Sequence, residues 1–207
     1  MNKLFLGGVT SLLFFLSACA AETNVQRGRM ALLYGDPTVA LASFQSAAEL
    51  DPNYFYFSVF PQGIWTYVGR AYYIAGKYPE ARHALERAIS LHKDDNMAKL
   101  YLGLNLARSG DRQRGLKEIE DGLRGLHEWL DSVNQYAAFS YGQYWEPTNE
   151  IRSEIQNSLT LISGKELDWQ KLIASGEWVG RKVEEEIDLA RQQESRDRSR
   201  GDDRGGD

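Results

Sequence analysis

A spacing pattern that returns after 34 residues limits the fold of this chain more than any other feature. Small and large side chains follow fixed intervals along residues 65–88, and the same intervals return along 99–122. The pattern also occurs at 28–47, with seven extra residues before the middle copy. An internal repeat of this length indicates a fold of stacked copies of one supersecondary unit.

Each copy predicts two helices that pack closely against each other. In the middle copy, Ala81, Leu85 and Ala88 fall on one face of a helix, and Gly69 lies inside the preceding helix. Glycine costs about 1 kcal/mol in a helix interior relative to alanine, so its presence there indicates a close approach by a neighbouring helix. Turn residues at 34–37, 76–79 and 109–111 separate the two helices of each copy.

This pattern resembles the tetratricopeptide repeat, a 34-residue pair of antiparallel helices. The matching segments are 21–54, 62–95 and 96–129, and the middle one matches best, with the sequence WTYVGRAYYIAGKYPEARHALERAISL. The third has Gly115 and Gly122 where the family usually has alanine. The resemblance implies an all-α, helix-turn-helix solenoid of about three repeats over residues 19–129. A generic helical bundle with small residues on its buried faces is the alternative.

The chain after the repeats predicts capping helices and then a disordered tail. Residues 128–138 continue as helix, and further helices are expected at 150–163, 165–174 and about 177–193, with breaks at 163–164 and 175–176. These helices, within 130–193, would cover the open end of the stack. Residues 194–207 contain no apolar side chain, so we expect them to be disordered.

The first residues predict export from the cytoplasm. Lys3 precedes an apolar run that ends at Leu16-Ser17-Ala18-Cys19, which contains the only cysteine of the chain. This stretch resembles the lipobox of bacterial lipoproteins. The resemblance implies that the signal peptide, residues 1–18, is cleaved before Cys19 and that Cys19 is acylated. An ordinary signal peptide with a chance cysteine is the alternative; the apolar stretch is too short for a typical transmembrane helix.

The same resemblance implies a location. Ala20, rather than aspartate, follows the cysteine, which in enteric-type bacteria implies sorting to the outer membrane, with the protein facing the periplasm. Removing residues 1–18 takes away Lys3 and no acidic residue, which changes the net charge from −5 to −6. An acidic chain of this kind argues against a nucleic-acid partner.

Catalytic and metal-binding motifs are missing from the sequence. His83, His92 and His127 do not have metal-ligand spacing, and no nucleophile motif or phosphate-binding loop occurs. We therefore expect a protein that is not an enzyme and uses no cofactor or metal. The rival hypothesis is a hydrolytic or glycan-processing enzyme whose site lies within 130–193, for example around Glu146, Glu150 and Glu154.

The family resemblance also predicts a binding surface. In such repeats the first helix of each pair lines a concave groove, and tyrosine and arginine are common at binding hot spots. The predicted partner-binding residues are Gln26, Arg29, Leu33, Tyr67, Arg70, Tyr73, Leu100, Tyr101, Leu104 and Arg108. We expect the partner to be a protein or peptide of the cell envelope, which suits a scaffold or adaptor in envelope assembly or secretion.

Alternatives to an open groove remain at this point. The C-terminal helices would fill the groove if they folded into it, and a structural spacer would self-associate through Tyr67 and Tyr101. Aromatic residues also gather at 54–78 and 136–145. These two clusters either pack on each other or form an exposed patch that docks a partner or a glycan.

Overall fold

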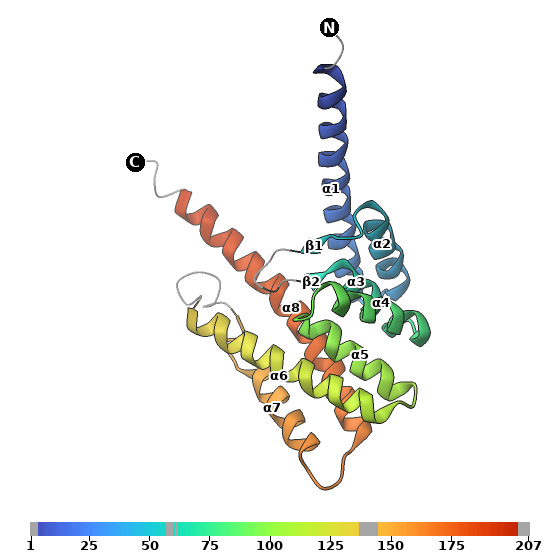
Figure 1. Cartoon of the computed structure of the whole chain (residues 1–207). Coiled ribbons are helices and arrows are strands. Elements are labelled where there is room, and N and C mark those ends of the chain that lie inside the picture. Colours follow the sequence, from blue (N-terminus) through green and yellow to red (C-terminus); the bar gives the residue numbers. More distant parts are fainter. Residues whose placement is uncertain (1–3, 57–59, 61, 137–144, 203–207) are drawn as a thin grey trace. The chain divides into compact units, whose positions relative to one another are not determined.

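A computed structural model describes residues 4–56, 60, 62–136 and 145–202 of the chain. These residues fold almost entirely as α-helices, as the sequence predicts (Figure 1). The helices are α1 (Leu4–Leu33), α2 (Pro37–Leu50), α3 (Ile64–Ile74), α4 (Tyr78–Leu91), α5 (Asn96–Arg108), α6 (Arg112–Tyr136), α7 (Glu150–Ile162) and α8 (Trp169–Asp202). Within the described part of the chain, no helix has the length and apolar character needed to cross a membrane.

The helices belong to two compact units. Unit 1 contains residues 1–56 and 61–93, and unit 2 contains residues 57–60 and 94–207. The first two predicted repeats, α1–α2 and α3–α4, therefore lie in unit 1, and the third, α5–α6, lies in unit 2 together with α7 and α8. The boundary thus falls between the second and third helix pairs rather than after the third.

The turns inside the helix pairs are confirmed at the predicted positions. Gly35, Gly76 and Gly110 have φ of 78°, 72° and 96°, a left-handed conformation that favours glycine. Immediately after the first of these turns, the carboxylate of Asp36 accepts a hydrogen bond of 3.0 Å from the backbone N–H of Val39 and caps α2. Local sequence is sufficient to end one helix and begin the next.

Glycines bring the two helices of each pair together, which confirms the small-residue pattern. A Cβ atom on Gly28 would lie 2.5 Å from the ring of Phe44, and one on Gly69 would lie 2.5 Å from Cγ of Leu85. In unit 2, a Cβ on Gly103 would lie 2.5 Å from the backbone nitrogen of Ile119. Real Cβ atoms do not approach so closely, so these helix pairs depend on a missing side chain at each crossing.

In unit 1 the two helix pairs also pack on each other. The ring of Phe44 on α2 stacks on that of Tyr67 on α3, with ring centres 5.0 Å apart. Residues between these pairs form a short antiparallel hairpin of β1 (Phe55–Tyr56) and β2 (Gln62–Gly63). The extra residues between the first two predicted repeats, 55–61, therefore include β1, whereas β2 coincides with the start of the second predicted repeat.

The C-terminal helices agree with the sequence in part. Helix α7 matches the expected 150–163, and α6 continues through the expected extension from residue 128. The prediction of two helices separated at Ser175 and Gly176 was wrong, because α8 is continuous from Trp169 to Asp202. Gly176 lies inside α8 where that helix approaches α5, so the glycine serves close packing rather than a break.

The expectation of a disordered tail is also corrected for part of its length. Residues 194–202 are helical, because α8 continues through them. Extending an existing helix avoids the cost of nucleating a new one, so a polar segment can remain helical at the end of a packed helix. Residues 203–207 lie outside the described residues.

Candidate protein-binding surface

Most of the ten residues predicted to line a groove are buried in the structure. They lie on α1, α3 and α5, the first helices of the three pairs. The buried ones are Arg29, Tyr67, Arg70, Tyr73, Leu100, Tyr101 and Leu104, and those of intermediate burial are Gln26 and Leu33. Only Arg108 is exposed. Their role in partner binding stays a prediction.

The two buried arginines of unit 1 have polar neighbours. Nη1 of Arg29 donates a hydrogen bond of 3.1 Å to Oε1 of Gln26. Nη1 of Arg70 donates a bond of the same length to Oε1 of Gln62, and its guanidinium lies 5.7 Å from the ring centre of Tyr67. A buried charge is costly to leave without partners, so replacing these arginines would disturb the fold as well as any binding.

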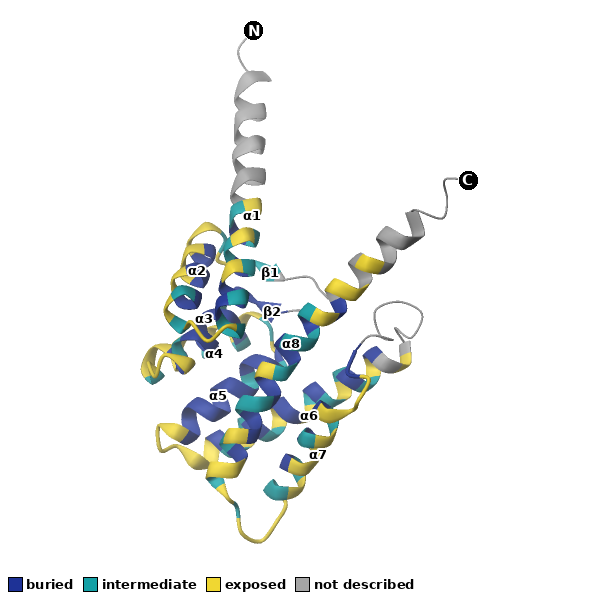
Figure 2. Ribbon diagram, turned by 180° about the vertical axis from the view of Figure 1, so that it is seen from behind, coloured by how far each residue is buried: buried dark blue, intermediate teal, exposed yellow. Residues whose placement is uncertain are grey.

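In unit 2, helix α8 covers the face of α5 that was predicted to bind a partner. A Cβ on Gly176 would lie 2.9 Å from Cδ2 of Leu104, and one on Gly180 would lie 2.6 Å from the ring of Tyr101. Arg108 forms an ion pair of 2.6 Å with Glu177 at the edge of this contact. Figure 2 shows α5 with mostly buried residues. On α5, therefore, a C-terminal helix fills the surface, which is the alternative that the sequence left open.

A different surface of unit 1 is open. A groove of about 550 Å³ lies over α3, with α2 and α4 as its two walls. We call it the α2–α4 groove. Its lining residues are Gln45, Ala48, Glu49, Trp65, Val68, Tyr72, Pro79, Glu80, His83 and Ala84.

Hydrogen bonds and stacking hold the aromatic side chains of this groove in place. Nε2 of Gln45 donates to the hydroxyl of Tyr72 at 2.7 Å. Nε1 of Trp65 donates to the backbone oxygen of Pro52 at 2.8 Å, and the guanidinium of Arg87 lies 3.7 Å from the Trp65 ring centre. The groove therefore has fixed walls and a mostly apolar lining, which is typical of binding sites.

Sequence reasoning did not identify the α2–α4 groove. The family resemblance directed attention to the first helices of the repeats, whereas both walls of this groove come from second helices. One signal was available in the sequence. Trp65, Val68 and Tyr72 occur at helical spacing on one face of α3, and that face is separate from the predicted groove residues.

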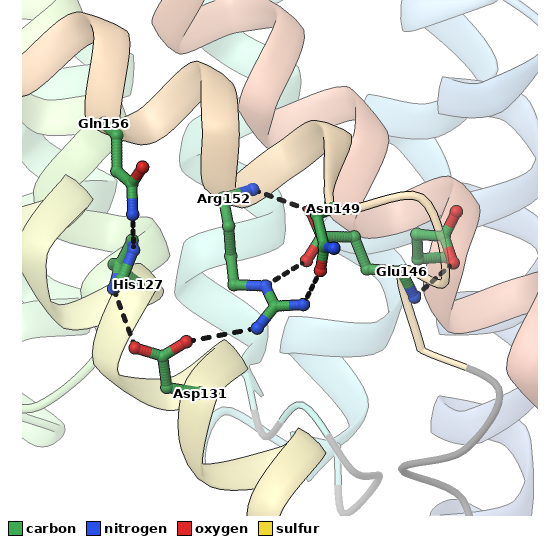
Figure 3. Close-up of polar contacts among 7 residues, drawn as sticks. His127, Asp131, Glu146, Asn149, Arg152 and Gln156 are labelled. Carbon is green, nitrogen blue, oxygen red and sulfur yellow. Dashed lines mark hydrogen bonds and ion pairs between the residues drawn. The ribbon is translucent and has the colours of Figure 1, made fainter.

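A polar network in unit 2 surrounds Arg152 of α7 (Figure 3). Nε of Arg152 donates to Oε2 of Glu146 at 2.7 Å, and its backbone N–H donates to Oε1 of the same carboxylate at 2.7 Å. The guanidinium also bonds Oδ1 of Asp131 at 3.3 Å and the side-chain oxygen of Asn149. The Glu146 side chain is 1% exposed, so Arg152 compensates a buried carboxylate.

The network continues to α6 and α8. Asp131 pairs with Nδ1 of His127 at 3.1 Å, and Nε2 of His127 lies 3.0 Å from Nε2 of Gln156. The backbone N–H of Glu146 donates to Oε2 of Glu186 at 3.2 Å. Burial raises the pKa of the Glu186 carboxyl above its usual value, against the opposing effect of this hydrogen bond.

This geometry bears on the rival hypothesis of an enzyme. Two of its three carboxylates have partners inside the protein, because Glu146 bonds Arg152 and Oε1 of Glu154 accepts a bond of 2.5 Å from Ser175. Glu150 is exposed in the first turn of α7. Among the described residues, no cluster of three or more His, Cys, Asp or Glu is placed to hold a metal ion.

One residue from each aromatic cluster, Phe60 and Trp145, packs against Trp129 in unit 2. The ring centre of Trp129 lies 4.5 Å from that of Phe60 and 4.9 Å from that of Trp145. Trp145 is buried. The remaining residues assigned to an aromatic loop, 137–144, and Phe57 lie outside the described residues.

The comparison with known families agrees with the helix pairs. Residues 63–95 match the family model described as tetratricopeptide repeat. This segment comprises α3, the turn at Gly76 and α4, and it is the copy that the sequence pattern marked as strongest. No curated protein matches the chain. From the matched segment and the helix-turn-helix pairs of the structure, we conclude that the chain contains a tetratricopeptide repeat at residues 63–95, within an all-α fold of helix pairs.

Proposed function

We propose that this protein is a lipid-anchored adaptor of the bacterial cell envelope that binds another protein. The tetratricopeptide repeat carries the proposal, because repeats of this family generally mediate contacts between proteins. The open, mostly apolar α2–α4 groove supports it, since it offers a surface that the rest of unit 1 leaves uncovered.

The position of Cys19 supports the lipid anchor. This residue is exposed, so a modifying enzyme has access to it. Buried residues begin directly afterwards, at Ala21 and Val25 on α1. Cleavage before Cys19 would keep both of these residues, and the acyl chains would be attached where the first repeat begins. Several acyl chains hold a protein firmly on a bilayer, where one alone is marginal.

Labelling and fractionation test the anchor. Cells that express the wild-type chain with radiolabelled palmitate are expected to give a labelled protein in the outer-membrane fraction, on the periplasmic face. Cys19→Ala should lose the label and wash off membranes. Ala20→Asp serves as the matched control, because it keeps the cysteine and should move the labelled protein to the inner membrane. A wild-type protein without label would contradict the anchor.

The proposed role is binding without catalysis. Glu146 and Glu154 have structural partners, as described above, and removal of their negative charge by Glu146→Gln and Glu154→Gln addresses the rival enzyme directly. A loss of turnover on peptidoglycan in these variants, with the fold retained, would favour the enzyme. Self-association through Tyr67 and Tyr101 has little structural support, because both side chains are buried.

Purification from native envelopes tests the adaptor role. The full-length tagged protein, extracted in mild non-ionic detergent, is expected to copurify with one protein in near-stoichiometric amount. A tagged, unrelated lipoprotein treated in the same way is the control for carry-over of membrane proteins. Recovery of the chain alone at physiological salt would contradict the proposal. Arg29 and Arg70 are poor positions for disruption, because both are buried.

A further inference from the structure

We infer that the α2–α4 groove binds a segment of the partner in which apolar side chains lie between two basic residues. This inference rests on the proposed function and adds the chemistry of the partner. It depends on three observations: the apolar floor of the groove, the acidic side chain at each end, and the absence of lysine or arginine among its lining residues.

The floor and inner walls of the groove favour apolar side chains. Val68 of α3, Ala48 of α2 and Ala84 of α4 contribute short apolar side chains, and Trp65 and Tyr72 contribute aromatic surface. Alanine on both walls leaves room between the helices, and the volume of about 550 Å³ falls within the range of ligand-binding clefts. Burying apolar atoms of a partner here would remove both surfaces from water.

The carboxylates of Glu49 and Glu80 lie towards opposite ends of the groove. Glu80 is in the first turn of α4, and the tight turn at Gly76 brings this turn next to the end of α3 that carries Tyr72. Glu49 is at the end of α2, close in sequence to Pro52, whose oxygen binds Trp65 near the start of α3. Tyr72 and Trp65 are seven residues apart on α3 and thus mark two ends of the floor.

The charges at the two ends of the groove indicate which kind of partner segment would bind there. Glu49 and Glu80 are exposed, and no lysine or arginine is among the ten lining residues; the guanidinium of Arg87 stacks on the Trp65 ring. A neutral or acidic segment would desolvate two carboxylates without a counter-charge, which is unfavourable. A lysine or arginine on each side of the apolar residues would instead form an ion pair at each end.

Two other occupants fit less well. A second copy of this chain carries a net charge of −5 and would generally oppose the acidic ends of the groove. The C-terminal segment 194–207 contains arginines, but it has no apolar residue to place on the floor. A separate protein with a basic and apolar segment therefore agrees best with both features of the groove.

Selection from a random library tests this inference without knowledge of the partner. Phage that display random dodecapeptides are selected on the immobilised full-length protein in non-ionic detergent. Enriched peptides are expected to carry apolar residues between lysine or arginine residues. Their affinity, measured by fluorescence anisotropy of the synthetic peptides, should fall at least tenfold in the charge-reversed variant Glu49→Lys/Glu80→Lys and should also fall with increasing salt.

Matched variants separate the groove from general charge effects. Glu128→Lys/Glu150→Lys makes the same change of charge at exposed positions of unit 2 and should leave the affinity unchanged. All four glutamates are exposed, so these substitutions are compatible with the fold.

Three results would overturn the inference: no enrichment, enrichment of neutral or acidic peptides, or equal loss of affinity in both charge-reversed variants. Copurification from envelopes distinguishes a failure of this inference from a failure of the proposed function. A protein that copurifies from envelopes equally well with wild type and with Glu49→Lys/Glu80→Lys would leave the adaptor role standing and remove the groove as its binding site.

Discussion

At the scale of single residues, the crossings between paired helices depend on what lies opposite each glycine. Gly69 faces mainly the side chain of Leu85, whereas Gly103 faces the backbone of α6, at Ile119 N and Gly115 O. A side chain can shift by rotation, but backbone atoms can move only with their helix. The same residue type in equivalent repeat positions is therefore expected to tolerate substitution differently.

Alanine substitution tests this difference. Gly103→Ala places a Cβ 2.5 Å from Ile119 N and 2.7 Å from Gly115 O, so α5 and α6 must separate. We expect a loss of about 2–3 kcal/mol in the free energy of unfolding. Gly69→Ala should lose less, because Leu85 can adjust, and both variants gain the same helix propensity, about 1 kcal/mol. Chemical denaturation measures both; equal losses would contradict the assigned contacts.

The buried ion pair of unit 2 gives a second residue-scale prediction. Arg152→Met leaves the Glu146 carboxylate buried without its guanidinium and should destabilise the protein by about 2–4 kcal/mol. Adding Glu146→Gln removes the buried charge and keeps a side-chain oxygen that can accept from the backbone N–H of residue 152. The double variant should therefore be more stable than Arg152→Met alone. A double variant that is less stable than either single variant would show that the pair is not coupled in this way.

The raised pKa of the Glu186 carboxyl predicts that the stability of the fold depends on pH. Burial raises the pKa of its carboxyl in the folded state, so the folded protein binds this proton more tightly than the unfolded chain. Stability from this group is thus complete below the ordinary glutamate pKa of about 4.3 and is lost as the pH rises through the raised value. Glu186→Gln should be more stable than wild type at pH 7, with a smaller difference near pH 4. Thermal melts at both pH values measure this; a less stable variant at pH 7 would contradict it.

At the scale of elements, the sequence predicted the helix pairs because their signals are local. Turn glycines, a capping aspartate and small residues at regular spacing all act within a few residues of their position. Whether Gly176 ends a helix or lies inside one was not predictable from such local signals. A glycine that breaks a helix and a glycine that admits another helix look alike in sequence, and only the presence of Leu104 opposite Gly176 distinguishes them.

The α2–α4 groove was unpredictable for a related reason. It is formed by side chains from three helices that are separated by up to about 40 residues in the chain, and its space depends on alanines that also fit a close-packed interface. The residues that the sequence predicted to bind a partner are ambiguous in the opposite direction, because most of them are buried within the chain itself. Tyr101 and Leu104 suit either a partner or a helix of the same chain, and in unit 2 that helix is α8.

The end of α8 provides the prediction at this scale. Deleting residues 194–207 should reduce the helical circular dichroism signal slightly, because residues 194–202 are helical. The melting temperature should change by no more than about 1–2 °C, because the segment has no apolar residue to bury. Deletion from residue 169 onward is the contrasting variant and should unfold unit 2, because it exposes Leu100 and Leu104. A large loss of stability on the shorter deletion would show that the tail packs.

At the scale of the whole molecule, a repeat fold would carry both the proposed lipid anchor and the proposed binding surface. The proposed anchor at Cys19 and the α2–α4 groove both lie in unit 1. An adaptor held at the membrane needs only a defined surface for a partner, and it needs no catalytic group. The sequence predicted the repeats, and the tether stays its prediction, whereas the α2–α4 groove was found in the structure.

Photo-crosslinking in living cells tests the central claim of protein binding most directly. A benzoylphenylalanine is introduced at His83, on the rim of the α2–α4 groove, or at Gln113, an exposed position of α6. The account predicts one major protein adduct from His83 that is absent from Gln113 and is lost with Glu49→Lys/Glu80→Lys. The absence of any protein adduct from His83, with the chain folded and in the membrane fraction, would contradict it.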